Sequence, residues 1–115
     1  MSRAALEARC LDLTRLALPA VAAARGWPIR ADHCFQRVLL DAACCGVWYD
    51  RIAGRPAYAH APAPLLAEAV RLGEAVLAGA VALAPLNRQS LAWRRVGRAS
   101  LSQQSASSEA LHRLL

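Results

Sequence analysis

Three absences narrow what this chain can be: it has no lysine, no paired C-x-x-C cysteines and no long apolar run. Arginine or proline interrupts every apolar stretch before it reaches the ~18 residues that suggest a membrane-spanning helix, so we expect no span. The first residues lack the unbroken apolar core of a signal peptide, which favours a cytoplasmic protein. In such a protein the four cysteines are expected to be reduced and to act as small hydrophobic residues.

The chain is rich in hydrophobic residues, which make up 57% of its 115 positions, and its fourteen arginines leave a net charge of +6. This length suits one domain that buries a core without disulfides or metals. Helical spacing of the apolar residues predicts an all-α, four-helix bundle-like domain over residues 1–96. We expect the helices near residues 2–18, 33–52, 64–78 and 87–96. The Ser/Gln-rich residues 97–115 predict a flexible tail, with room for a short docked helix at its end.

Two amphipathic patterns define the expected core. In residues 2–18 the inward positions at 3–4 spacing are Leu6, Cys10, Leu13 and Ala17. Pro19 then predicts that this helix ends, kinks or restarts, because proline clashes with the carbonyl four residues earlier. In residues 64–78 the expected inward face is Leu65, Leu66, Ala69, Leu72, Gly73, Val76 and Leu77.

Most of the chemically capable side chains lie in residues 32–50, which we assign to a helix capped by Asp32 and running to about Ile52. Its predicted core face contains Cys34, Phe35, Val38, Leu39, Ala42, Cys45, Tyr49 and Ile52. Cys44 falls off this face and is expected to be more exposed. Val47 and Trp48 fall on the outer side, where they can contribute to a homodimer interface.

Polar residues border that core face and predict a site between two helices. His33, Arg37 and Asp41 share one side of residues 33–52, and Asn87, Ser90 and Arg94 share a stripe of residues 87–96, which Asn87 is expected to cap. If the two helices face each other, the six groups meet in one cleft.

Two interpretations of this cleft stay open: a buried structural network, or a binding site for an anionic small molecule or a protein partner's carboxylate. Arginine favours such ligands because its fork matches carboxylates and phosphates. The alternative is a small enzyme that uses the same cleft. There, His33 or Asp41 acts as a base and Arg37 or Arg94 stabilises developing negative charge.

The segment between residues 53 and 64 contains Gly54 and three prolines, which predicts a stiff loop. Arg55, Tyr58 and His60 lie on it, and we expect it to cover the open end of the cleft as a lid. Tyr58 is therefore a predicted ligand-binding residue, together with Arg37, Asn87, Ser90 and Arg94.

Two further kinds of site are less favoured by the sequence. The atoms for a zinc site exist in Asp32, His33, Cys34, Cys44, Cys45 and His60, but adjacent residues on a helix point 100° apart. We therefore predict no metal and no cofactor. Nucleic-acid binding through an arginine-rich segment with an interleaved tryptophan is a weaker interpretation than a solvated arginine face. The residues concerned are Arg88, Trp93, Arg94, Arg95 and Arg98.

Several short motifs within residues 30–95 resemble short bacterial proteins that carry uncharacterised or GNAT-type N-acetyltransferase labels. The matching segments are His33-Cys34-Phe35, Leu40-Asp41, Trp48, Pro56-Ala57-Tyr58, Leu86-Asn87 and Ser90-Leu91-Ala92-Trp93-Arg94. The resemblance implies an acyl-transfer activity and a pyrophosphate-binding loop, to which Arg94, Gly97 and Ala99 correspond. The mixed sheet of that family departs from the helical pattern of this chain.

Overall fold

A computed structural model describes residues 2–96, and these residues form helices and loops without a strand. The elements are, in chain order, α1 (Arg3–Asp12), η1 (Leu13–Ala17), α2 (Leu18–Ala22), α3 (Asp32–Cys44), η2 (Trp48–Asp50), α4 (Ala57–His60), α5 (Ala63–Leu77) and a last helix over residues 83–96. The predicted all-α fold class is confirmed. The predicted tail at 97–115 lies outside the described residues.

The first helical segment passes through Pro19 by changing its hydrogen-bond pattern. Between α1 and α2, η1 is a π-helical turn in which the amide of Leu18 reaches back to the carbonyl of Leu13. Proline has no amide to donate and its ring clashes with the carbonyl four residues earlier, so the wider turn allows the helix to continue. α2 therefore contributes Leu18 and Ala22 to the core. Ala17, which was expected to face inward, is only half-buried.

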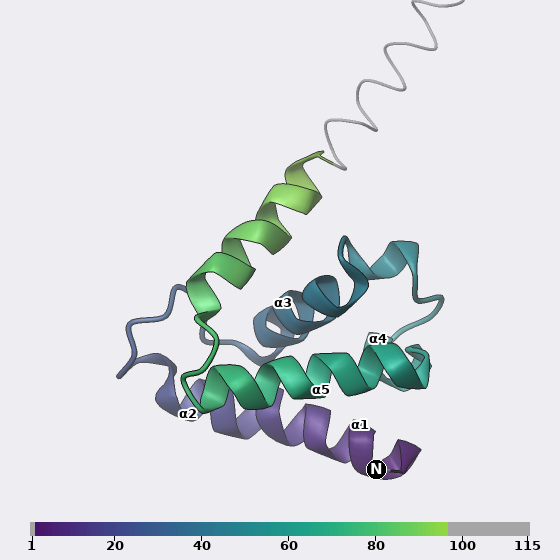
Figure 1. Cartoon of the computed structure of the whole chain (residues 1–115), viewed down its shortest axis with the longest axis horizontal. Helices are drawn as coiled ribbons and strands as arrows, with labels where there is room; N and C mark the ends of the chain where they lie inside the picture. Colours follow the sequence, from purple (N-terminus) through teal and green to yellow (C-terminus); the bar gives the residue numbers. More distant parts are fainter. Residues whose placement is uncertain (1, 97–115) are drawn as a thin grey trace, which may run out of the picture.

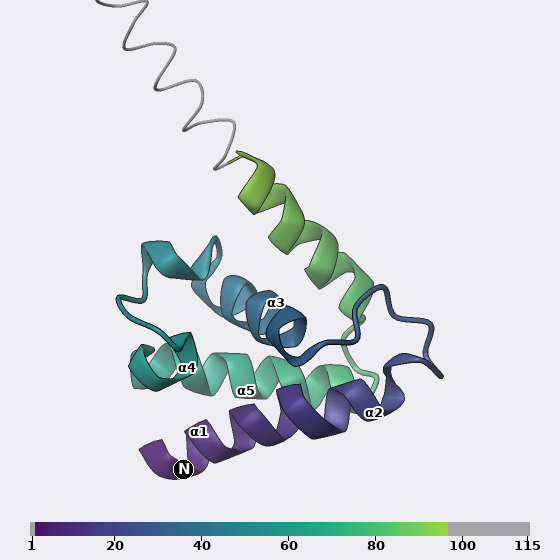
Figure 2. The same cartoon turned by 180° about the vertical axis from the view of Figure 1, so that it is seen from behind.

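α5 lies between the first helical segment and α3, as both views of the fold show (Figures 1 and 2). Its predicted inward face is largely confirmed, with Leu66, Ala69, Gly73 and Val76 buried. Gly73 allows the close approach, because a Cβ there would lie 3.0 Å from Leu13 Cδ1 and 3.1 Å from Leu39 Cδ1.

α3 ends at Cys44 rather than near Ile52, which corrects the predicted helix. Cys45 takes a left-handed conformation with φ of 54°, and the amide of Gly46 bonds to the carbonyl of Asp41 at 3.1 Å. Such a left-handed residue closes a helix.

The burial of the cysteines and of Val47 is also different from the prediction. Cys44 is buried and Cys45 exposed, because Cys45 lies beyond the last helical turn. Tyr49, expected in the core, is exposed for the same reason. Val47 turns inward with only 7% of its surface exposed, so the predicted outer surface of Val47 and Trp48 is wrong for Val47.

The last helix begins at residue 83, so Asn87 lies inside it and does not cap it as expected. It runs obliquely away from the end of α5 and past α3 (Figure 1). Leu83, Asn87 and Ser90 are its buried residues, and two of these three are polar. No helix within the described part of the chain has both the length and the apolar composition that crossing a bilayer requires.

Candidate functional site

Asp41 is the centre of the polar cluster and is completely buried. Its carboxylate accepts hydrogen bonds from Ser90 Oγ at 2.6 Å and from the backbone amide of Trp48 at 2.9 Å. Arg94 donates two more, from Nε at 2.9 Å and from Nη2 at 3.1 Å. A carboxylate has about four lone-pair positions, so Asp41 is fully engaged.

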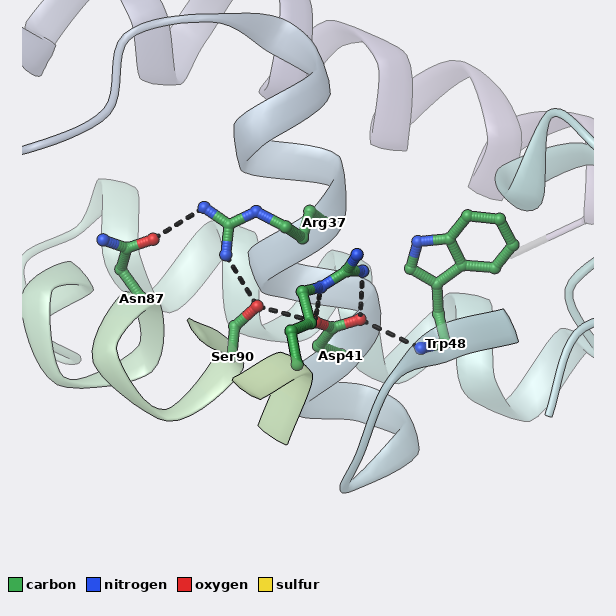
Figure 3. Close-up of polar contacts among 6 residues, drawn as sticks. Arg37, Asp41, Trp48, Asn87 and Ser90 are labelled. Atoms are coloured by element: carbon green, nitrogen blue, oxygen red, sulfur yellow. Dashed lines mark hydrogen bonds and ion pairs between the residues drawn. The ribbon is translucent and has the colours of Figure 1, made fainter. Parts of the chain in front are cut away.

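Arg37 extends the cluster along the interface between α3 and the last helix (Figure 3). Its Nη1 donates to Ser90 Oγ at 2.7 Å and its Nη2 to Asn87 Oδ1 at 2.8 Å. Ser90 is thus a relay, because its hydroxyl accepts from Arg37 and donates to Asp41. Within residues 2–96, no buried side-chain nitrogen or oxygen lacks a hydrogen-bond partner.

Five of the six predicted cleft residues therefore meet, and they form a connected network. The sixth, His33, lies apart from it: its side chain is 81% exposed, and its Nδ1 lies 3.6 Å from Asp32 Oδ1. The helical spacing of the two polar stripes brings the five together, since residues three and four apart share one helix face.

A pocket of about 330 Å³ opens beside the network. Three arginines border it, and the rest of its lining is two polar residues and a larger apolar wall of four residues. The lining residues are His33, Gln36, Arg37, Leu40, Trp48, Arg55, Pro56, Ala57 and Arg94. Arg37 and Arg94 thus belong to both the network and the pocket lining.

The segment that was predicted to cover the cleft reaches the pocket through Arg55, Pro56 and Ala57, not through Tyr58. The Arg55 guanidinium lies over the Trp48 ring, 5.0 Å from its centroid. Tyr58 instead packs against the core from the side of α1 and η1, where the Arg15 guanidinium lies 6.0 Å from its ring. Arg3 donates to the backbone carbonyls of Tyr58 and Ala61, which holds this part of the loop against α1.

The chemistry available to the site follows from these positions. Asp41 has no free lone pair for a substrate proton, so its role is to hold Arg94, Ser90 and the Trp48 amide in place. His33 lies on the pocket rim, is open to water, and is the one imidazole among the lining residues.

The cysteines do not contribute a reactive thiol to the pocket. Burial raises the pKa of the Cys10 thiol to about 11, and burial also raises the pKa of Cys44. Both therefore stay neutral, which suits packing and not nucleophilic attack. Residues 2–96 hold no group of three histidine, cysteine, aspartate or glutamate side chains able to ligate a metal.

The arginine-rich segment does not present a continuous basic face. Arg94 is turned inward to Asp41, leaving Arg88 and Arg95 as the exposed arginines of the last helix, with Trp93 half-buried. Arg98 lies outside the described residues, as do Gly97 and Ala99 of the GNAT-like loop pattern.

Sequence reasoning placed Arg55 on the lid without naming it as a ligand-binding residue, and it did not assign these other lining residues to the site: Gln36, Leu40, Trp48, Pro56 and Ala57. Gln36 follows from the phase of α3, since it lies between His33 and Leu40 on one side of the helix. Arg55 and Pro56 carry no such periodic signal, because they lie in a loop.

Comparison with models of protein families, with curated proteins and with solved structures finds no match to this chain.

Proposed function

We propose that the protein is a small binding or accessory protein whose pocket takes an anionic small molecule or the carboxylate of a partner. The observation that carries this proposal is the charge of the lining. Arg37, Arg55 and Arg94 border the pocket, and no aspartate or glutamate of residues 2–96 is among the lining residues. Guanidinium groups form short, charge-assisted hydrogen bonds to carboxylates and phosphates, so such a lining favours anions.

The network supports binding because it fixes two of the three arginines before a ligand arrives. Arg37 is held by Ser90 and Asn87, and Arg94 by Asp41. A side chain that is already ordered loses less conformational entropy when a ligand binds. Asp41 neutralises the charge of Arg94 from the buried side. Arg37 bonds only to neutral groups, so Arg37 and Arg94 together with Asp41 carry a net positive charge beside the pocket.

The enzymatic alternative rests on His33, because Asp41 is fully engaged and His33 lines the pocket. In this alternative His33 removes or delivers a proton while Arg37 and Arg94 stabilise negative charge on the substrate. An acyl-transfer reaction of the GNAT type belongs to the same alternative. The enzymatic alternative predicts that His33→Gln abolishes turnover of a substrate, while the affinity of the protein for that substrate stays within a factor of two.

A cytoplasmic location forms part of the proposal. All four cysteines are free thiols, and Cys45 is exposed, a state that a reducing compartment maintains.

A titration of the ¹⁵N-labelled full chain with acetate, benzoate and inorganic phosphate tests the binding proposal. At least one of these anions is expected to shift arginine Nε–H signals saturably. Arg37→Gln should weaken that binding at least tenfold, since a hydrogen bond to a charged group contributes about 1.5–3 kcal/mol. Arg55→Gln should weaken it by fivefold or less, because exposed charges contribute up to ~1 kcal/mol.

The matched control is Arg88→Gln, which removes an exposed arginine that does not line the pocket. It should leave the affinity unchanged. Far-UV circular dichroism confirms that each variant is helical. The proposal fails if none of the three anions binds saturably, or if Arg88→Gln weakens binding as much as Arg55→Gln and Arg37→Gln do.

A further inference from the structure

The pocket joins a cationic corner to an apolar wall, and we infer from this division that its ligand is a small aryl carboxylate. This inference rests on the proposed anion-binding function and adds the chemical class of the ligand. The cationic corner and the apolar wall each determine one part of the ligand.

The cationic corner has unused hydrogen-bond donors. Arg37 and Arg94 each donate two hydrogen bonds to the network, out of the five N–H donors that a guanidinium carries. The indole N–H of Trp48 has no hydrogen-bond partner among residues 2–96. Because no buried side-chain nitrogen there lacks a partner, this N–H is accessible to solvent. Figure 3 shows the indole nitrogen on the side of the ring that faces the Arg37–Asp41 network. These donors suit the two oxygens of one carboxylate.

The apolar wall consists of Leu40, Trp48, Pro56 and Ala57. It offers no charge to a second anionic group, so the remainder of the ligand must be apolar. The indole and the proline ring are flat surfaces, and aromatic rings stack on or pack edge-on against such surfaces. Arg55 already places its planar guanidinium over the Trp48 ring, so a ring inserted beside Trp48 meets a planar cation as well.

A carboxylate is favoured over a phosphate because two backbone amides of lining residues, those of His33 and Trp48, already donate within the fold. Phosphate sites are commonly built from the free amides of a helix N-terminus. In α3 the first turn carries Asp32, whose own Oδ1 accepts the amide of His33 at 2.8 Å. The amide of Trp48 is donated to Asp41.

The size of the pocket favours a free small molecule over the end of a protein chain. Its volume of about 330 Å³ is at the lower end of the ~300–1,000 Å³ range of ligand pockets. The Arg55–Pro56 segment borders it on one side and the last helix, through Arg94, on another.

The test is a comparison of benzoate, acetate, inorganic phosphate and neutral benzamide, titrated into the ¹⁵N-labelled full chain and followed at the tryptophan indole and arginine Nε–H signals. Trp48→Phe assigns the Trp48 indole signal. Benzoate is expected to bind at least tenfold more tightly than acetate or phosphate, with benzamide at least tenfold weaker than benzoate.

Each other outcome overturns a defined part of the inference. Acetate or phosphate binding as tightly as benzoate overturns the aryl class and leaves anion binding standing. Benzamide binding as tightly as benzoate overturns the role of charge and, with it, the proposed function. No saturable shift with any anion also overturns the proposed function. A tetrapeptide ending in phenylalanine that binds more tightly than benzoate overturns the free small molecule in favour of a partner's C-terminus.

A pair of tryptophan variants tests the apolar wall separately. Trp48→Leu keeps an apolar side chain but removes the flat ring and the N–H, so it should weaken benzoate at least fivefold relative to the unmodified chain. Trp93→Leu removes a half-buried tryptophan of the last helix that does not line the pocket, and should leave benzoate affinity unchanged. Equal benzoate affinity in Trp48→Leu and the unmodified chain overturns the assignment of this wall.

Discussion

Asp41→Asn is the substitution that best tests whether the polar network stabilises the fold. Asparagine keeps the shape of the side chain, but it has one acceptor oxygen and an NH₂ group that cannot accept the bonds of Arg94 and Ser90. The guanidinium of Arg94 then loses its counter-charge at a site where its own side chain is only 22% exposed.

Breaking a buried ion pair by removing one partner costs about 3–5 kcal/mol. Because water reaches part of Arg94, we expect the lower end of this range, about 3 kcal/mol of unfolding free energy. For a domain of this size, 1 kcal/mol changes Tm by roughly 4–8 °C, so Tm should fall by about 12–24 °C. Urea unfolding followed by far-UV circular dichroism measures the first quantity, and a thermal scan the second.

The matched control is Asp50→Asn, because Asp50 is exposed and makes no ion pair within the described residues. It should change stability by less than about 0.5 kcal/mol. A double variant, Asp41→Leu with Arg94→Leu, should be at least about 1 kcal/mol more stable than the sum of the single effects, since it removes both partners and leaves neither as an unpaired buried charge. A cost below about 1 kcal/mol for Asp41→Asn would refute the reasoning.

Four further predictions concern the core and the loop. Gly73→Val should destabilise the fold by about 1–3 kcal/mol in urea unfolding, because its side chain collides with η1 and α3. Iodoacetamide at pH 8 should alkylate Cys45 first and spare Cys10 and Cys44 until the protein unfolds, as mass spectrometry will show; early labelling of Cys10 contradicts its burial. Burial raises the pKa of Cys10 from 9.0 to about 11, so its contribution to stability is complete below pH 9 and disappears towards pH 11; Cys10→Ala should lack that pH dependence. Tyr58→Ala should lower the unfolding free energy by about 2 kcal/mol, half the value for a fully buried aromatic, and leave benzoate affinity unchanged; weaker benzoate binding would restore Tyr58 to the site.

The polar cluster could be predicted from the sequence because it depends on helix periodicity. Arg37 and Asp41 are four residues apart, and Asn87, Ser90 and Arg94 are spaced by three and four, so each set must share one helix face. An aspartate near the core face needs a cationic partner. The spacing left Arg37 and Arg94 as candidates, and it is Arg94 that pairs with Asp41. The inward face of α5 followed from the same spacing.

The end of α3 and the direction of the loop could not be predicted in this way. α3 stops because Cys45 adopts a left-handed conformation, which a non-glycine residue rarely takes, and the neighbouring Gly46 was consistent with several other turns. Tyr58 faces α1 because Arg3, more than fifty positions earlier, donates to the loop carbonyls. Such a contact between distant parts of the chain leaves no local signal in the sequence.

The π-helical turn before Pro19 has a consequence for how the first helix can change. It adds one residue to a single turn, so the helical phase after it is shifted by about 100°. At regular spacing, Ala17 and Val21 would continue the inward face of Leu13, but with the added residue Leu18 and Ala22 do so, and both are fully buried. Pro19→Ala should therefore leave the π turn in place, since a return to regular α-helix would rotate Leu18 into water. Deleting one residue between 14 and 17 would impose that rotation directly.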